Sequence, residues 1–198
     1  PVLCEKPLAE DAAAALRIVE AEQRSGVQRV QVGFMRRFDA EYVRLRELIG
    51  SKDLGELLLL RCIHRNPSVI DYYTQDMLIT DSVVHELDVV PWLAGSAIRT
   101  IEVRHGRRNS LAPAHLDEPI LVLLELENGL LADVEMNVNV RFGYQVATEG
   151  VFEQGIARIG QPAGMQVWED GSARIGEHRS FTTRFAAAYD AQVQSWVD

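Results

Sequence analysis

The sequence predicts an α+β fold in which a short parallel strand–helix–strand unit precedes a helix-backed, mostly antiparallel open sheet. Three observations favour this class. The first thirty-odd residues show a strand pattern, an alanine-rich helix pattern and a second strand pattern. Two further segments then have apolar residues at helical spacing. From residue 98 onward the apolar residues recur at every second position, which is typical of strands with one buried face.

The opening unit consists of a strand at residues 2–4, a helix from about residue 8 to residue 26 and a strand at residues 29–34. Gly26 is the expected C-terminal end of the helix. A strand, a helix and a strand in this order are the repeating unit of a parallel doubly wound sheet, and one such unit cannot make a nucleotide-binding fold. Because the sequence starts on a strand and without an initiator Met, we expect the chain to begin partway through a domain.

The middle of the chain contains two predicted helices with a strand between them. Helical spacing over residues 38–49 predicts a helix that ends at Gly50, and residues 57–63 form an apolar strand. A polar and aromatic loop follows and leads into a helix over residues 79–93, which ends at Gly95.

The second half is dominated by strand patterns. Residues 120–126 and 130–140 alternate cleanly and are joined across Asn128-Gly129, whose glycine readily takes positive φ in a tight hairpin turn. One face of this hairpin should pack on a core, and the other should face solvent, a partner subunit or a pocket. Further strands are predicted at residues 144–148, 156–159, 165–168 and 173–175, the last two joined at Asp170-Gly171, before a closing helix at residues 185–197.

Composition excludes several classes of partner and location. The 198 residues carry a formal net charge of -9, so the surface should repel both nucleic acid and anionic membranes. No apolar run approaches the roughly 20 residues needed to cross a bilayer. Cys4 and Cys62 lack the spacing of a metal site or a disulfide framework. We therefore expect reduced, buried thiols in a cytoplasmic protein whose partner is a small molecule or another protein.

One side of the predicted helix over residues 79–93 carries groups able to do acid–base chemistry. Asp81, His85 and Asp88 are four and three residues apart, so they should face the same way. A histidine can accept an alcohol proton near neutral pH, and a carboxylate one turn away can orient the ring and stabilise the imidazolium. An exposed polar face, or a buried histidine held by a carboxylate, would give the same pattern. The neighbouring polar, aromatic loop makes the functional interpretation as strong as the structural one.

A metal site is the competing chemical interpretation of these residues. His85 and the two aspartates could supply three ligands, with His64 as a fourth. Their spacing matches no metal-binding motif, so we predict no metal here.

Donor-rich residues follow three of the predicted strands, and ligands of open α/β sheets bind at such strand ends. Lys6 could place a cation beside a reacting hydroxyl, and Pro7, which can adopt a cis peptide bond, could fix where Lys6 points. Arg36, His64 and Asn66 could bind a polyhydroxylated ligand through directional hydrogen bonds. The alternative is that these residues only tie loops to the sheet.

Four motifs give the sequence a resemblance to a known family. They are Glu5-Lys6-Pro7, residues 33–39 (GFMRRFD), residues 64–67 (HRNP), and residues 81–88 followed by Trp92-Leu93. Over essentially its whole length the chain resembles the glucose–fructose oxidoreductase and inositol dehydrogenase family (Gfo/Idh/MocA). The last three motifs look specifically like those of inositol 2-dehydrogenases. Such enzymes combine a Rossmann domain with an α/β domain that has a large open sheet.

The resemblance implies a division into two domains. Residues 1–34 would be a remnant of the Rossmann NAD-binding domain, and residues 35–198 a substrate-binding and catalytic domain like the C-terminal domain of dihydrodipicolinate reductase, incomplete at its C-terminal end. The sequence contains no glycine-rich phosphate loop and no acidic ribose-binding residue of a dinucleotide site. The implied cofactor is NAD, with NADP not excluded, and we expect the chain by itself to bind NAD poorly and to be inactive.

The resemblance also implies a set of site residues. Lys6, Asp81 and His85 would be catalytic, with His85 as the base that takes the hydroxyl proton while hydride leaves for the nicotinamide. Lys6 would hydrogen-bond the reacting oxygen and face the cofactor. The substrate, an inositol or a related sugar, would contact Met35, Arg36, His64, Asn66 and Tyr144.

Two further expectations concern assembly and the rival function. The open sheet of the family usually packs against other subunits, so a homo-oligomer, a dimer or tetramer, is implied. The rival is a non-catalytic module of the same fold that binds a sugar or oligomerises. A scaffold has no need for a base, a carboxylate and a lysine at one cleft, which favours the oxidoreductase.

Overall fold

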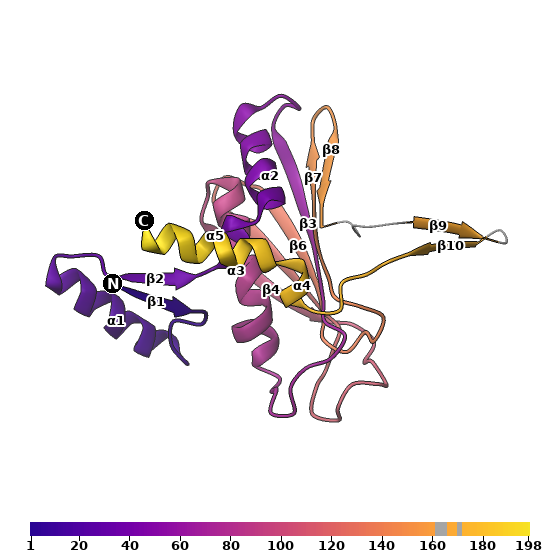
Figure 1. Cartoon of the computed structure of the whole chain (residues 1–198), viewed down its shortest axis with the longest axis horizontal. Helices are drawn as coiled ribbons and strands as arrows, with labels where there is room; N and C mark the ends of the chain where they lie inside the picture. The colour runs from indigo at the N-terminus through magenta and orange to yellow at the C-terminus, as the bar shows by residue number, and fades with distance from the viewer. Residues whose placement is uncertain (161–165, 170–171) are drawn as a thin grey trace.

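The computed structural model describes residues 1–160, 166–169 and 172–198. These residues form a six-stranded sheet, a layer of helices on one face of that sheet, and a small parallel unit beyond the helices (Figure 1). The predicted α+β class, with a mostly antiparallel sheet, is therefore confirmed. No helix within the described ranges is both long enough and apolar enough to cross a membrane.

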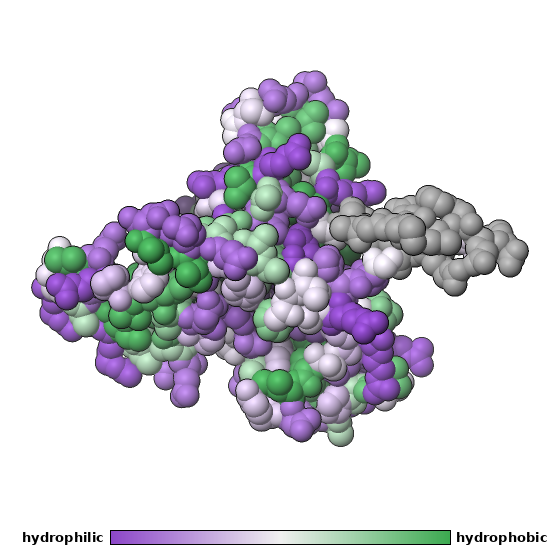
Figure 2. Space-filling model, in the orientation of Figure 1, coloured by the Kyte–Doolittle hydropathy of each residue, from purple (hydrophilic) through white to green (hydrophobic). Residues whose placement is uncertain are grey.

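The parallel unit consists of β1 (Val2–Glu5), α1 (Ala12–Ser25) and β2 (Val30–Gly33). The two strands pair in parallel, and α1 ends at Gly26 in the left-handed conformation, as predicted. None of the residues of α1 is buried. Figure 2 shows hydrophobic residues gathered over this unit, at the left of the view. The unit thus presents an apolar surface of Val2, Leu16, Ile18, Val19 and Val27.

The next elements are a short 3₁₀ helix η1 (Met35–Phe38), α2 (Ala40–Ser51) and β3 (Leu57–Arg65). The helix predicted over residues 38–49 is therefore confirmed in position but wrong in its end. Gly50 is helical, and the left-handed residue that ends α2 is Lys52, with φ 59°. A glycine within a helix costs about 1 kcal/mol relative to alanine, so it does not by itself end one.

The helix predicted over residues 79–93 consists of two segments. The first is a π-helix, η2 (Leu78–Val83), and the second is α3 (Val84–Ala94), which ends at Gly95 as predicted. A π-helical turn holds more residues than an α-helical turn. Side chains that straddle the junction therefore do not follow the angular spacing that an uninterrupted α-helix would give.

The main sheet has the strand order β4-β5-β6-β3-β7-β8. All neighbouring strands are antiparallel except β3 and β6, which pair in parallel. The hairpin predicted across Asn128-Gly129 is confirmed, with Gly129 at φ 85°. The remaining strands are β4 (Ile98–His105), β5 (Ile120–Leu126), β6 (Leu131–Asn137), β7 (Gln145–Phe152) and β8 (Ile156–Ile159).

In the part of the chain that the structure describes, helices pack against one face of this sheet and leave the other face uncovered. Alternate residues face α2 and α3 and are fully buried, among them Leu60, Val122, Leu124, Val134 and Val146. The intervening residues lie on the other face, which no helix of the described ranges covers (Figure 1). That face carries half-exposed leucines at positions 121 and 123 and ion pairs such as Arg65–Glu135.

Near the C-terminus, β9 (Gln166–Glu169) and β10 (Ser172–Ile175) form a separate antiparallel pair that extends away from the main sheet (Figure 1). The predicted strand start at Met165 and the predicted turn at Asp170-Gly171 lie outside the described residues. The single closing helix predicted at residues 185–197 is preceded by a short helix, so that α4 (Phe181–Arg184) leads into α5 (Ala186–Val197).

Helix α5 joins the parallel unit to the rest of the molecule. Gln192 is fully buried, and its Nε2 donates a hydrogen bond of 2.8 Å to Glu5 Oε1 at the end of β1. The packing leaves no room at Gly33 on β2, where an added Cβ would lie 2.5 Å from Glu5 Oε1. The hydrogen bond between Gln192 and Glu5 fixes the end of β1, and Lys6 is the next residue along the chain.

Candidate functional site

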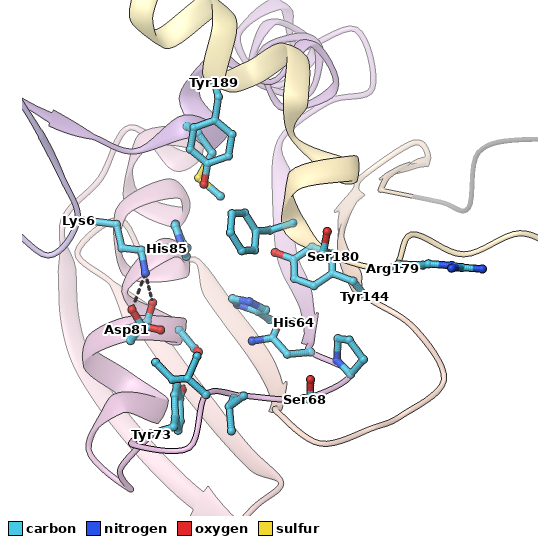
Figure 3. A pocket seen from close by; sticks show the side chains of 17 residues that line it. Lys6, His64, Ser68, Tyr73, Asp81, His85, Tyr144, Arg179, Ser180 and Tyr189 are labelled. Atoms are coloured by element: carbon cyan, nitrogen blue, oxygen red, sulfur yellow. Dashed lines mark hydrogen bonds and ion pairs between the residues drawn. The ribbon is translucent and has the colours of Figure 1, made fainter.

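A cavity of about 410 Å³ lies where β1, β2 and β3 end and where η2 meets α3. Its volume is in the range of small-ligand sites. Of the predicted site residues it is lined by Lys6, Met35, His64, Asn66, Asp81, His85 and Tyr144. Figure 3 shows Lys6, Asp81 and His85 on one side of this cavity and His64 and Tyr144 on the other.

Lys6 is held by both the side chain and the main chain of Asp81. Its Nζ lies 2.8 Å from Asp81 Oδ1 and donates a second hydrogen bond of 2.7 Å to the Asp81 carbonyl oxygen (Figure 3). The Lys6–Pro7 peptide bond is cis, as the sequence suggested. An ammonium group has three N–H donors. Two are used by Asp81, so one remains for a ligand.

His85 is 7% exposed and packs edge-on against Phe34, with ring centroids 6.4 Å apart. Burial lowers the pKa of His85 well below its ordinary value, and the positive charges of Arg36 and Lys6 lower it further. The imidazole is therefore neutral at pH 7. A neutral imidazole has a lone pair and can accept a proton.

The predicted relation between His85 and the two aspartates is only partly realised. Within the described residues Nδ1 of His85 has no hydrogen-bond partner, and the Asp81 carboxylate bonds Lys6 instead of orienting the ring. Asp88 does not line the cavity and pairs with Arg37 at 2.5 Å. His85 and Asp88 both belong to α3, so the π-helical turn before them does not separate them; the pairing with Arg37 holds the Asp88 carboxylate outside the cavity. Among the described residues no group of three or more metal-ligand side chains converges.

His64 and Tyr144 form the wall opposite Lys6. The His64 ring centroid lies 6.1 Å from that of His85 and 6.3 Å from that of Tyr144. Burial lowers the pKa of His64, so this ring is also neutral near pH 7. Burial raises the pKa of Tyr144, which keeps its hydroxyl protonated. The wall therefore offers uncharged hydrogen-bonding groups, which suit a ligand rich in hydroxyls.

Arg36 is placed behind the cavity wall. It is 1% exposed, does not belong to the lining and forms an ion pair with Glu86, which is fully buried. Its Nη2 lies 3.1 Å from His64 Nδ1. Glu86 was not predicted as a site residue. Buried charges are rare, and its partner lies fifty positions away in the sequence, so no local pattern marks it.

The structure adds lining residues that were not predicted as site residues. Tyr73 belongs to the predicted aromatic loop, and its hydroxyl lies 2.7 Å from Ser82 Oγ. The C-terminal segment after β10 contributes a second set of lining residues. They were not predicted, because β9 and β10 separate them in the sequence from the other residues of the cavity. The added lining residues are Pro67, Ser68, Val69, Ile70, Tyr73, Ser82, Arg179, Ser180, Phe181 and Tyr189.

The two neutral histidines predict a pH dependence of stability. Their pKa values are lowered in the folded state from an ordinary value of 6.5, so the unfolded chain binds more protons below that pH. The free energy of unfolding should therefore fall from pH 7.5 to pH 5.5, by about 1.4 kcal/mol for each histidine that stays neutral. Urea unfolding at several pH values measures this. The His85→Gln variant should show a smaller fall, and an identical fall in the variant would contradict the assignment.

Comparison with known proteins places the chain in a family. The GFO/IDH/MocA C-terminal domain matches residues 42–158. An inositol 2-dehydrogenase from Leifsonia xyli subsp. xyli is 68% identical over 198 residues, which are 100% of this chain and 58% of that protein. An inositol 2-dehydrogenase from Corynebacterium glutamicum is 65% identical over 198 residues, 100% of this chain and 59% of that protein. The chain thus spans less than two thirds of the length of these relatives.

A solved structure agrees with this match. The crystal structure of a myo-inositol dehydrogenase from Lactobacillus casei in complex with NAD(H) and myo-inositol superposes with a TM-score of 0.94 at 31% identity. The superposition covers 99% of this chain and 58% of that one. The predicted resemblance is confirmed, and the chain belongs to the GFO/IDH/MocA family, with its C-terminal domain at residues 42–158.

Proposed function

We propose that this chain is the substrate-binding and catalytic portion of an NAD-dependent inositol 2-dehydrogenase. The observation that carries the proposal is the convergence of Lys6, Asp81 and His85 on one cavity whose opposite wall holds neutral hydrogen-bonding groups. The relatives' names and the myo-inositol complex of the Lactobacillus casei enzyme favour an inositol as the substrate.

In the proposed mechanism, a secondary hydroxyl of the ring sits between Lys6 and His85. The free N–H of Lys6 donates to the reacting oxygen and stabilises the negative charge that grows there. His85 is neutral and takes the hydroxyl proton. Asp81 holds Lys6 in place through its carboxylate and its carbonyl oxygen. The wall residues His64, Asn66 and Tyr144, with Met35, orient the remaining hydroxyls.

The site fits a nicotinamide cofactor. Lys6 and Met35 follow the ends of two parallel strands, β1 and β2, and dinucleotides bind at that edge of a parallel sheet. When bound, the nicotinamide supplies the acceptor for the hydride of the oxidised carbon. Lys6 is the residue that we propose to face it, and NAD is preferred over NADP because the Lactobacillus casei structure contains NAD(H).

We further propose that residues 1–34 belong to the nucleotide-binding domain and residues 35–198 to the substrate domain. The exposed apolar surface of α1, with Leu16 and Val19, supports the first part, because such a helix is ordinarily covered by neighbouring elements of its sheet. The uncovered face of the main sheet supports a homo-oligomer, a dimer or tetramer. Sedimentation of the full-length enzyme measures this oligomeric state.

The test of function is a substrate panel. A full-length enzyme, in which this chain is joined to its nucleotide-binding domain, is assayed for reduction of NAD and of NADP with inositol isomers and pyranose sugars. We expect oxidation of an inositol with NAD. A well-folded full-length protein that oxidises no polyol would reject the dehydrogenase and favour a non-catalytic sugar-binding or oligomerisation module.

A further inference from the structure

Three ionisable side chains meet behind the cavity wall, away from solvent. Glu86 is 0% exposed, Arg36 1% and His64 3%. Glu86 Oε1 accepts a hydrogen bond from Arg36 Nη1, and Glu86 Oε2 lies 3.1 Å from His64 Nδ1. Of the three, only His64 lines the cavity. Any influence of the other two on a ligand must therefore pass through its ring.

Nδ1 of His64 lies close to one group that can only donate a hydrogen bond and to another that can only accept one. Arg36 Nη2 lies 3.1 Å from it and can only donate, whereas an ionised Glu86 can only accept. A neutral imidazole carries one N–H, so Nδ1 can satisfy only one of the two. The choice also decides the other nitrogen. A hydrogen on Nδ1 makes Nε2 an acceptor, and a bare Nδ1 makes Nε2 a donor.

The carboxylate makes the stronger demand. Burial raises the pKa of Glu86, but the charge of Arg36 and the hydrogen bonds that Arg36 and His64 donate outweigh it and lower the pKa overall, so Glu86 stays ionised. A bare Nδ1 would leave Glu86 Oε2 buried, charged and facing a lone pair. A bond from Nδ1–H to the carboxylate and a bond from Arg36 to a bare Nδ1 are both charge-assisted, but Glu86 Oε2 has no other hydrogen-bond donor among the described residues. Arg36 keeps its own bond to Oε1 in either case.

We propose that Glu86 is a positioning residue that holds His64 as the Nδ1–H tautomer, so that Nε2 accepts a hydrogen bond from a ligand hydroxyl in the cavity. The role toward a hydroxyl rests on the proposed function. An acceptor at this point admits an alcohol and disfavours a carbonyl oxygen, which has no hydrogen to donate. Glu86 thereby contributes to the choice of a polyol without touching it.

The tautomer can be measured directly in the unsubstituted chain. The sequence has five histidines, so selective ¹⁵N-histidine labelling gives a simple spectrum, and His64→Gln identifies the signals of His64. At pH 7.5 we expect a protonated-type nitrogen shift for Nδ1 and an unprotonated-type shift for Nε2. A hydrogen on Nε2, alone or together with one on Nδ1, would overturn the proposal.

The substitution Glu86→Gln should reverse the tautomer. Its amide oxygen must face Arg36, which only donates, so its NH₂ group faces His64 Nδ1 and obliges that nitrogen to accept. We expect the hydrogen to move to Nε2. The KM of the full-length enzyme for inositol should then rise at least about fivefold, because one buried hydrogen bond to the substrate is lost. Asp88→Asn on the same helix, which removes a carboxylate paired with Arg37, should change neither. Retention of Nδ1–H in Glu86→Gln would contradict the proposal.

The two readouts separate this proposal from the proposed function. The nitrogen shifts need no substrate and no cofactor, and the spectrum of the unsubstituted chain decides the tautomer even where Glu86→Gln does not fold. An Nδ1–H tautomer in a protein that oxidises no inositol would support the role of Glu86 and reject the dehydrogenase. An active inositol dehydrogenase with Nε2–H would reject only the role of Glu86.

Discussion

Replacing His85 with glutamine is expected to lower kcat of the full-length enzyme by about 100- to 10,000-fold, the usual contribution of a general base. His85 lines the same cavity as Lys6, and its lowered pKa leaves the ring unprotonated across the physiological range. Glutamine keeps a polar side chain but cannot take the proton. Initial rates of NADH formation at saturating inositol measure the loss.

His105→Gln is the matched control for this substitution. The His105 side chain is about half exposed, lies beside Asp117 and does not line the cavity, so the same exchange there should leave kcat unchanged. A His85→Gln enzyme that keeps its full rate would show that His85 is a structural residue of α3. The mechanism proposed above would then be wrong.

Replacing Lys6 with methionine is expected to lower kcat by about 100- to 1,000-fold, the effect of removing one donor from a developing oxyanion. Methionine keeps the length of the side chain and removes only the ammonium group. The protein should still fold, because Asp81 is partly exposed and water can reach its carboxylate once the ammonium group is gone. The rate of NADH formation, together with a thermal unfolding curve, distinguishes a catalytic loss from a folding defect.

Lys52→Met provides the control, since Lys52 is exposed, pairs with Glu56 on the surface and does not line the cavity. Its kcat should match that of the unsubstituted enzyme. Equal rates for Lys6→Met and Lys52→Met would mean that the contact between Lys6 and Asp81 is only structural.

The strands and the hairpin were predictable because their signals are local. Alternation over residues 120–126 and the turn at Asn128-Gly129 depend on neighbours in sequence, and both are confirmed. The parallel pairing of β3 with β6 was not predictable, because residues such as Leu60 and Ala132 meet only after the intervening chain has folded. The end of α2 was misplaced for a related reason, since any residue able to adopt the left-handed conformation can end a helix.

The features of the candidate site also fall into those with a local sequence signal and those without one. Lys6, His64 and His85 stand in recognisable motifs, and the structure brings all three to one cavity. The sequence could not reveal that Asp88 pairs with Arg37 outside the cavity, because these two side chains, 51 positions apart, meet only in the folded chain. The pairing of Glu86 with Arg36 likewise depends on two helical segments that meet only in the folded chain. These predictions of individual roles stay predictions until they are measured.

The hydrogen bond between Gln192 and Glu5 has a consequence for the order of events during synthesis. The ribosome releases Glu5 and Lys6 long before Gln192, and domains begin to fold as they emerge. The strands β3 to β8 can therefore pair while the end of β1 is still unanchored. The end of β1 gains this hydrogen bond only after α5 has been made. Proteolytic removal of α5 from the finished protein should accordingly abolish the activity of the site, while the six-stranded sheet stays folded.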